Sequence, residues 1–250
     1  MNKKRKLKKI EKQKRQLIQK KPWTFGIQET VREKIPDKAL SGLESAFAKS
    51  FSLIFKKGNG WIEKVSHIDD AKALGEFLSK EFSEKEDKKT WKQYEKVANA
   101  SSRKHLALTQ VKSSAMGLFG IGIPDIPIYI ATLLSSIYQV GAVYGFDIQT
   151  ERERQYVLML LCAVCDEPEN REEWMKKLEH YEQYLATDLT TEYLIQRAAH
   201  ALSYSELQAK FLQGIPIVGV AGALMSSNLQ AKIVSFAKKC YQRRRLLKVG

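Results

Sequence analysis

Apolar residues recur along this chain at the three- and four-residue spacing of an amphipathic helix. The clearest row steps by three, four, four and three positions: Leu40, Leu43, Phe47, Phe51 and Ile54. This spacing places its members on one face of a helix, which Gly58 ends after a basic last turn. No convincing run of alternating apolar and polar residues is present, so the pattern does not predict β-strands.

Residues 151–166, ERERQYVLMLLCAVCD, begin charged and become almost wholly apolar, as a helix at the centre of a protein does. Residues 170–186 and 190–213 have the pattern of two further amphipathic helices. No repeat of solenoid period interrupts the chain. The sequence therefore predicts an all-α protein, a single compact helical domain with a central apolar helical core and basic terminal helices.

The composition is that of a globular chain, with 44% hydrophobic and 28% charged residues over 250 positions. The mean hydropathy of −0.36 excludes a polytopic membrane protein. The net charge of +14 is unevenly placed. Residues 1–21 carry eleven Lys/Arg and one acid, residues 232–250 carry seven Lys/Arg and no acid, and residues 22–231 carry 24 bases and 27 acids. We therefore divide the chain into a basic amphipathic arm (1–21), an all-helical domain (22–231) and a basic C-terminal helix or tail (232–250).

Such basic arms attract polyanions. In the first arm, four apolar residues fall near one helix face, which Lys14 interrupts. This basic amphipathic pattern suits an acidic membrane surface. Nucleic acid is the less favoured partner, because Tyr241 is the one aromatic residue beside the charge of the second arm. The residues expected to contact an anionic surface are Lys3, Lys4, Arg5, Lys6, Lys8, Lys9, Arg243, Arg244 and Arg245.

Two uncharged, glycine-rich segments cover residues 126–146 and 211–231. Each has 21 positions, enough to cross a bilayer, and two crossings would leave both basic arms on the inside. An integral protein with two spans is therefore one alternative. The other interpretation is a buried helical hairpin, because the equally apolar residues 155–165 are too short to cross and need packing partners. We favour the buried hairpin.

Asp125 stands in an otherwise uncharged stretch, and Asn228 stands in the apolar final segment. Asp125 can cap the helix that follows it, and Asn228 can be a buried amide bonded to the Asp125 loop. Alternatively, the two face a pocket for a small apolar ligand or a substrate. A buried carboxylate demands a partner, which favours placing the two together. The candidate pocket residues are Asp125, Asn228, Gly120, Gly122 and Gly219.

No recognised catalytic or cofactor motif accompanies this pair. The glycine loops lack the Lys of a phosphate-binding loop and follow no strand. Cys162 and Cys165 have a CxxC spacing but apolar flanks, which indicates buried thiols and not a zinc site. The four histidines are scattered. We therefore predict no catalytic residues, no metal and no cofactor.

The order of several motifs resembles the EcsC family. Residues 120–127 read G-x-G-x-P-D-x-P, an apolar helix leads to Tyr144-Gly145-Phe146-Asp147 and then to a helix with a charged start, and residues 214–219 read GIPIVG ahead of Asn228. The resemblance covers residues 110–235 well and 22–110 loosely. It implies an all-helical, cytoplasmic, membrane-associated bacterial protein, from a family named for the operon of an ATP-driven exporter. It supplies no established catalytic residues.

Together these observations predict a non-enzymatic protein on the inner face of the cell membrane. It would bind anionic lipid through its basic arms and glycine-rich apolar loops, and it would assist an ABC-type exporter or a protein secretion component. The alternatives are the pocket at Asp125 and Asn228, the protein with two spans, and nucleic-acid binding through the arms.

Overall fold

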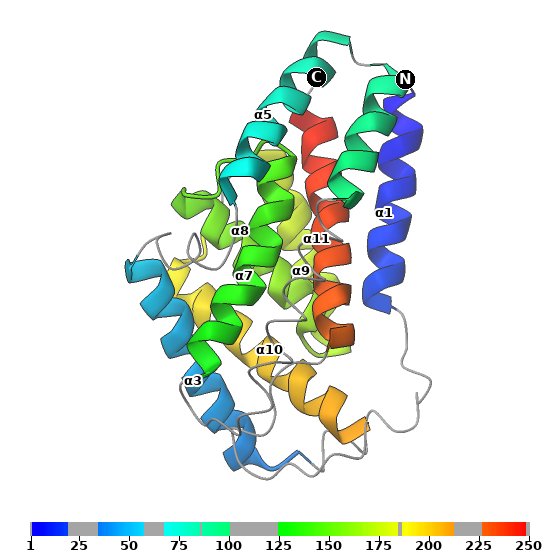
Figure 1. The fold of residues 1–250 in the computed structure, drawn as a ribbon. Helices are drawn as coiled ribbons and strands as arrows, with labels where there is room; N and C mark the ends of the chain where they lie inside the picture. The colour runs from blue at the N-terminus through cyan, green and yellow to red at the C-terminus, as the bar shows by residue number, and fades with distance from the viewer. Residues whose placement is uncertain are drawn as a thin grey trace.

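The computed structural model describes residues 2–19, 35–57, 68–85, 87–100, 125–184, 187–212 and 227–248. Across these residues it consists of helices and their connections, without a strand (Figure 1). The predicted all-α class is therefore confirmed. The helices are α1 (Lys3–Gln19), α3 (Asp37–Lys57), α5 (Ile68–Lys85), α7 (Asp125–Val143), α8 (Glu151–Cys165), α9 (Pro168–Tyr184), α10 (Thr191–Leu212) and α11 (Ser227–Lys248), with a further helical run over residues 88–100.

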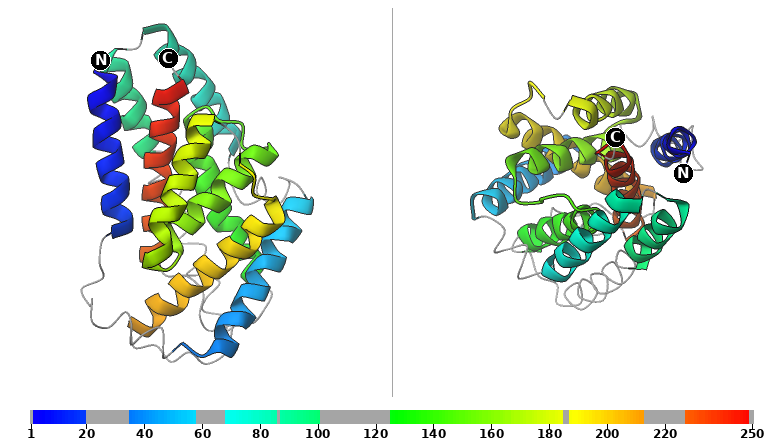
Figure 2. Two further views of the ribbon diagram at one scale, coloured as in Figure 1. Left: turned by 180° about the vertical axis from the view of Figure 1, so that it is seen from behind. Right: turned by 90° about the horizontal axis from the view of Figure 1, so that it is seen from above.

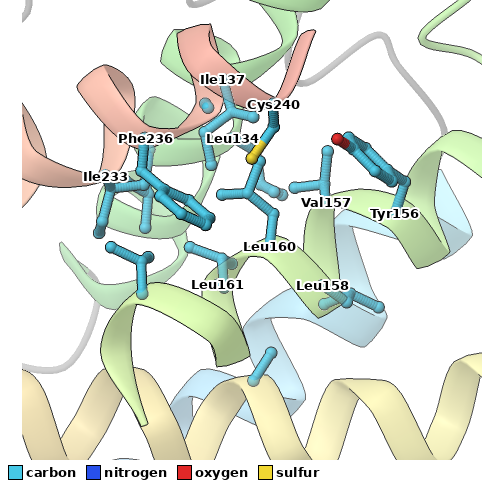
Figure 3. Close-up of a cluster of buried hydrophobic side chains, with 14 of the residues drawn as sticks. Leu134, Ile137, Tyr156, Val157, Leu158, Leu160, Leu161, Ile233, Phe236 and Cys240 are labelled. Atoms are coloured by element: carbon cyan, nitrogen blue, oxygen red, sulfur yellow. The ribbon is translucent and has the colours of Figure 1, made fainter. Parts of the chain in front are cut away.

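Helix α8 forms the centre of the core, as its sequence predicts. Residues 156–165 are all fully buried, and the helix packs against α9, α10 and α11. Its Leu160 and Leu161 lie beside Leu134 of α7 and Phe236 of α11 (Figure 3). The helix begins with its charged residues at Glu151, where the Thr150 side chain accepts a hydrogen bond from the backbone N of Glu153 (3.2 Å) and so satisfies a free N–H of the first turn.

The first uncharged segment forms α7, which packs against α3, α5 and α11. Within the described residues, α7 is the helix that is long and apolar enough to cross a membrane, with a mean hydropathy of 1.5 over Ile126–Val143. However, 83% of that stretch is buried inside the protein, which is the behaviour of a core helix. Most of the second segment, residues 213–226, lies outside the described residues, so its place in the expected hairpin stays a prediction.

Two glycines shape the end of α7. Gly145 has a φ of 73°, a left-handed conformation that glycine adopts without strain. Its N–H bonds to the carbonyl of Ala142 (2.8 Å), and the N–H of Phe146 bonds to that of Gly141 (3.1 Å), which is the Schellman arrangement. Gly75 of α5 lies so close to α7 that a Cβ atom there would sit 1.9 Å from the carbonyl oxygen of Ala142. The α5–α7 contact therefore requires glycine at position 75.

The two basic arms are helices packed against each other. Helix α1 runs antiparallel to α11, and both chain termini lie at the same end of the molecule (Figures 1 and 2). Ile10 and Ile18 of α1 are buried, as are Ile233 and Phe236 of α11. Each arm therefore contributes to the core, and neither is a solvated tail.

Candidate functional site

The expected polar pair lies at the start of two neighbouring helices. Asp125 is the first residue of α7 and Asn228 is the second residue of α11, and these helices pack against each other. Gln230 Nε2 donates to Ser136 Oγ across their interface (3.4 Å). The Asn228 side chain is exposed, so its interpretation as a buried amide is wrong.

The rest of the expected pocket cannot be built from the described residues. The cap predicted at Asp125 concerns a side chain outside the described part of the structure, although the helix does begin at that residue. The three pocket glycines also lie outside the described residues: Gly120, Gly122 and Gly219. A pocket between Asp125 and Asn228 therefore stays a prediction.

The C-terminal arginines point into the protein. Arg244 is 7% exposed, and its Nη1 donates to both carboxylate oxygens of Glu153 (2.8 and 3.0 Å). Its guanidinium carbon also lies 4.1 Å from the centre of the Phe146 ring and 3.9 Å from that of Tyr156, within cation–π range. The charge of Arg244 is therefore used inside the fold.

The neighbouring arginines are also engaged. Arg245 is 5% exposed, and its Nη2 donates to the backbone oxygen of Ser79 (2.5 Å) and to Ser83 Oγ (2.8 Å). Arg243 pairs with Glu182 through Nη1. The expectation that these arginines contact an anionic surface is wrong for Arg244 and Arg245, because both are buried. Arg243 forms its ion pair with Glu182, a buried acid of α9.

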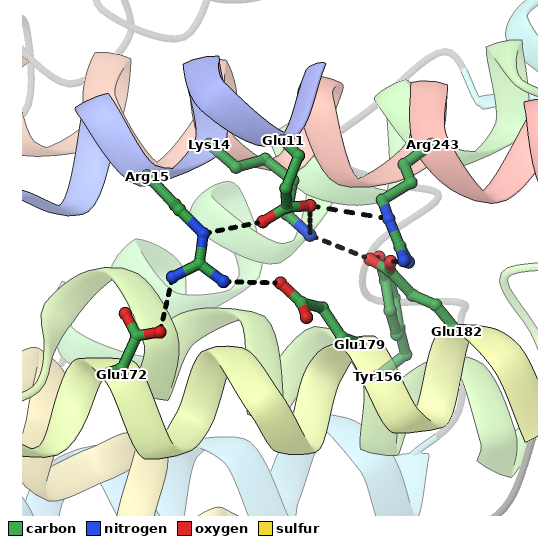
Figure 4. Close-up of polar contacts among 8 residues, drawn as sticks. All are labelled: Glu11, Lys14, Arg15, Tyr156, Glu172, Glu179, Glu182 and Arg243. Carbon is green, nitrogen blue, oxygen red and sulfur yellow. Dashed lines mark hydrogen bonds and ion pairs between the residues drawn. The ribbon is translucent and has the colours of Figure 1, made fainter. Parts of the chain in front are cut away.

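Inside the protein, a network of charged side chains joins α1, α9 and α11 (Figure 4). Lys14 of α1 is fully buried, with its Nζ 3.6 Å from Glu182 Oε1 and 3.5 Å from Glu11 Oε2. Tyr156 of α8 also donates to Glu182 (2.8 Å). Arg15 completes the network by pairing with acids of α9, Glu172 and Glu179, the latter at 3.4 Å.

The network shifts the pKa values of its members in opposite directions. Burial is the largest influence on the pKa of Lys14 and acts to lower it, but the charges of its acidic neighbours, Glu182 first and Glu11 among them, together outweigh burial, so this pKa is raised. Burial opposes ionisation of Glu11, yet Lys14 and Arg243 hold its pKa below the usual value. Burial and the neighbouring Glu11 carboxyl raise the pKa of Glu179 to about 7. At neutral pH, Lys14 and Glu11 are therefore ionised, and Glu179 titrates.

The outward-facing cations gather where the two arms meet the helical run 88–100. Lys6 Nζ lies 3.6 Å from Glu95 Oε2 and 4.5 Å from the centre of the Trp91 ring. Burial lowers the pKa of Lys6, Glu95 counteracts this, and the charges of Lys9 and Lys88 lower it further.

The same crowding reaches α11. Burial lowers the pKa of Lys239, and Lys238, Lys9 and Lys6 add to the effect. We call the whole group the lysine cluster: Lys6, Lys9, Lys88, Lys238 and Lys239. Beside it on α1, the side chains of Lys4, Arg5 and Lys8 are exposed and that of Lys3 is half-buried.

The sequence identified the α1 members of the lysine cluster but missed the others. Lys238 and Lys239 precede the arginine run, and Lys88 lies in a mixed-charge stretch far along the chain. Only the antiparallel contact of α1 with α11, and of both with residues 88–100, brings these charges together. No spacing within a single helix signals such a contact.

Comparison with known proteins identifies relatives of this chain. The sequence model of the EcsC protein family matches residues 2–246, a range that includes most of both basic arms. Protein EcsC of Bacillus subtilis (strain 168) is 25% identical over 158 residues, which is 62% of this chain and 59% of that protein. No solved structure matches the chain.

Proposed function

Because this chain belongs to the EcsC family, we propose that it is a peripheral membrane protein that binds anionic lipid on the inner face of the cell membrane. The observation that carries the proposal is the lysine cluster. Five cations from three parts of the chain lie close together there. The charges of neighbouring lysines lower the pKa of Lys6 and of Lys239, and Glu95 raises both pKa values. Folding has brought together like charges that repel one another, and an anionic surface relieves that repulsion.

The size of the effect is sufficient for reversible attachment. A lysine or arginine close to an anionic membrane contributes about 1 kcal/mol at physiological ionic strength. The exposed α1 residues Lys4, Lys8 and Lys9 alone therefore supply about 3 kcal/mol, equivalent to roughly a 100-fold change in partition. The proposal includes the apolar glycine-rich loops as a second point of contact, and it gives the protein no catalytic role.

The proposal extends to a partner. Family membership supports a role beside an ABC-type exporter or a protein secretion component, since the family is named for such an operon. Site-directed crosslinking from the exposed face of α1 in intact cells tests this part. Crosslinking of an exporter or secretion subunit from position 5, but not from α3, would support the proposed partner. Crosslinking to lipid alone would reject the proposed partner.

Vesicle sedimentation tests the lipid part. The test variant carries Lys4→Gln, Lys8→Gln and Lys9→Gln, three exposed positions outside the buried network. The control variant removes the same charge from α3, which lies away from the chain termini (Figure 1), at three other exposed positions: Lys38, Lys49 and Lys56.

We expect the natural protein to sediment with phosphatidylglycerol vesicles and not with phosphatidylcholine vesicles. The α1 variant should lose at least tenfold in binding at physiological salt, and the α3 variant should stay within twofold. Equal binding to neutral and anionic vesicles would remove the proposed lipid binding, and equal losses in the two variants would remove the exposed lysines of α1 beside the lysine cluster as its site.

A further inference from the structure

A cavity of about 440 Å³ lies on the side of α11 away from the lysine cluster. Its walls come from the turn between α7 and α8, the first turn of α8, the last turn of α9 and the last two turns of α11. The volume falls in the range of small-molecule sites, about 300–1,000 Å³, and equals roughly fifteen water volumes. The cavity is therefore large enough for a ligand of modest size.

The acids in its wall are already neutralised. Glu153 accepts hydrogen bonds from Arg244 (2.8 and 3.0 Å) and from Tyr241. Glu182 accepts from Tyr156 (2.8 Å) and pairs with Arg243 and with Lys14 of the network. Neither buried carboxylate therefore presents an uncompensated negative charge to the cavity.

The cations of the wall keep donors free. Arg244 uses Nη1 for Glu153, and its Nε and Nη2 make no hydrogen bond to any described residue. Arg152 and Lys248 are exposed at the cavity, and within the described part of the chain no acid pairs with either side chain. Asp147 is the exposed acid of the same wall, and its carboxylate accepts from the backbone N of Gln149 (3.0 Å).

Apolar surface lines the rest of the cavity. Phe146 and Leu247 are both half-buried there, and Tyr181 also lines the cavity. Tyr181 is held in place because its hydroxyl donates to the backbone oxygen of Arg152 (2.7 Å). The cavity thus combines unpaired cationic donors with an apolar wall.

We propose that this cavity binds a small amphipathic anion, with its phosphate or carboxylate group among Arg152, Arg244 and Lys248 and its apolar part against Phe146 and Leu247. Arginine suits this role because its planar donors fit phosphate and carboxylate oxygens. The ligand is either a membrane phospholipid or a soluble alkyl phosphate, which present the same chemistry. This inference stands apart from the proposed function, because it uses none of the residues of the lysine cluster.

Titration calorimetry with the full chain tests the inference. The probes are octyl phosphate, inorganic phosphate, which lacks the apolar chain, and octyl glucoside, which lacks the charge. We expect octyl phosphate to bind with a 1:1 stoichiometry and at least tenfold more tightly than either of the others. Dihexanoyl-phosphatidylglycerol, used as a monomer, identifies the source: binding as tight as that of octyl phosphate assigns a phospholipid, and weaker binding assigns a soluble alkyl phosphate.

Three variants locate the binding. Arg152→Gln and Lys248→Gln change exposed residues and should each weaken octyl phosphate binding about tenfold. Leu247→Trp should fill the cavity and abolish binding, with the circular dichroism spectrum confirming that the fold is kept. The α1 variant with three glutamines should bind octyl phosphate as the natural protein does.

Octyl phosphate binding that is absent, or unchanged in both charge variants, would overturn the inference, and so would an equal loss in the α1 variant. Vesicle binding distinguishes the two proposals. If the natural protein and Lys248→Gln sediment alike with anionic vesicles but no amphiphile binds, the cavity inference fails and the proposed function stands.

Discussion

The substitution Lys14→Met tests whether the basic N-terminal helix belongs to the folded core. Lys14 is fully buried, and its Nζ lies within 3.6 Å of Glu182 and 3.5 Å of Glu11. Methionine retains the apolar stem of the side chain but removes its charge, so the change isolates the ion pairs from the packing. Because the pKa of Lys14 is raised, the charge is present throughout the neutral range, and its stabilising contribution would be lost only at strongly alkaline pH.

The expected magnitude follows from the partners that remain. Removing one member of a buried ion pair typically costs about 3–5 kcal/mol, because the other charge is left unpaired. Here Glu182 keeps Tyr156 and Arg243, and Glu11 keeps Arg15 at 3.4 Å and Arg243 at 3.5 Å. We therefore expect a smaller loss, about 2 kcal/mol in the free energy of unfolding. For a chain of this length, that loss lowers the Tm by about 4–8 °C.

Urea unfolding followed by far-ultraviolet circular dichroism measures the loss. The matched control is Lys12→Met, which makes the same chemical change at an exposed position of α1 and should alter stability by no more than about 0.5 kcal/mol. Equal stabilities of the two variants would show that α1 does not dock with Lys14 inward. A stabilised Lys14→Met protein would refute the conclusion that the ion pairs of Lys14 stabilise the fold.

Two further predictions concern pH and packing. The pKa of Glu179 is about 7 in the folded protein, above the usual carboxyl value, so stability falls as the pH rises from that usual value to about 7, where the unfolded chain is ionised first. The Tm of Glu179→Gln should therefore fall less between pH 5 and pH 8 than that of the natural protein. Equal falls would argue against the contact with Glu11. Gly75→Ala would place a Cβ atom 1.9 Å from the carbonyl oxygen of Ala142 and should cost about 3 kcal/mol, the upper end of ordinary overpacking. An unchanged urea midpoint would show that α5 does not approach α7 as closely as described.

The sequence predicts the core well because burial leaves a strong signal along a helix. The change from charged to apolar residues within α8 identifies the central helix, and its last ten residues, 156–165, are fully buried on every side. The free thiols of this helix are buried as expected, and burial raises the pKa of Cys165 to about 12. Hydropathy alone does not say whether α7 crosses a membrane or fills a core. The fold favours a core helix, because α3, α5 and α11 pack against α7 and most of it is buried.

The direction of charged residues is harder to predict, and the arginine run shows why. Consecutive residues of a helix project about 100° apart, so Arg243, Arg244 and Arg245 cannot all face one flat surface. Helical geometry therefore indicates that part of the run points inward. It does not identify the partners, because Glu153 and Glu182 belong to helices formed by distant parts of the sequence.

The candidate pocket was predicted from composition and could be compared with the structure at two positions. Asp125 begins α7, as its predicted role at a helix start indicated, whereas Asn228, expected within an apolar segment, is the second residue of the neighbouring α11. The exposure of Asn228 was not predictable, because a polar residue at a helix start can face either solvent or core. The cavity beside Arg244 escaped prediction for a different reason: its wall combines three separate stretches of the chain, none of which carries a recognisable motif.

Helix α1 presents two electrically different faces, and this separation makes the proposed function testable. Its inward charges, such as Lys14, are paired inside the protein, where added salt screens them little. Its outward charges, such as Lys9, crowd against other lysines and are exposed to screening. The net charge of residues 1–21 sums the paired inward charges and the exposed outward charges, so it does not distinguish the two faces of the helix. Because the faces are distinct, exposed lysines can be removed without disturbing the ion pairs that hold α1 in place, so a loss of vesicle binding in such a variant reports on the membrane surface and not on unfolding.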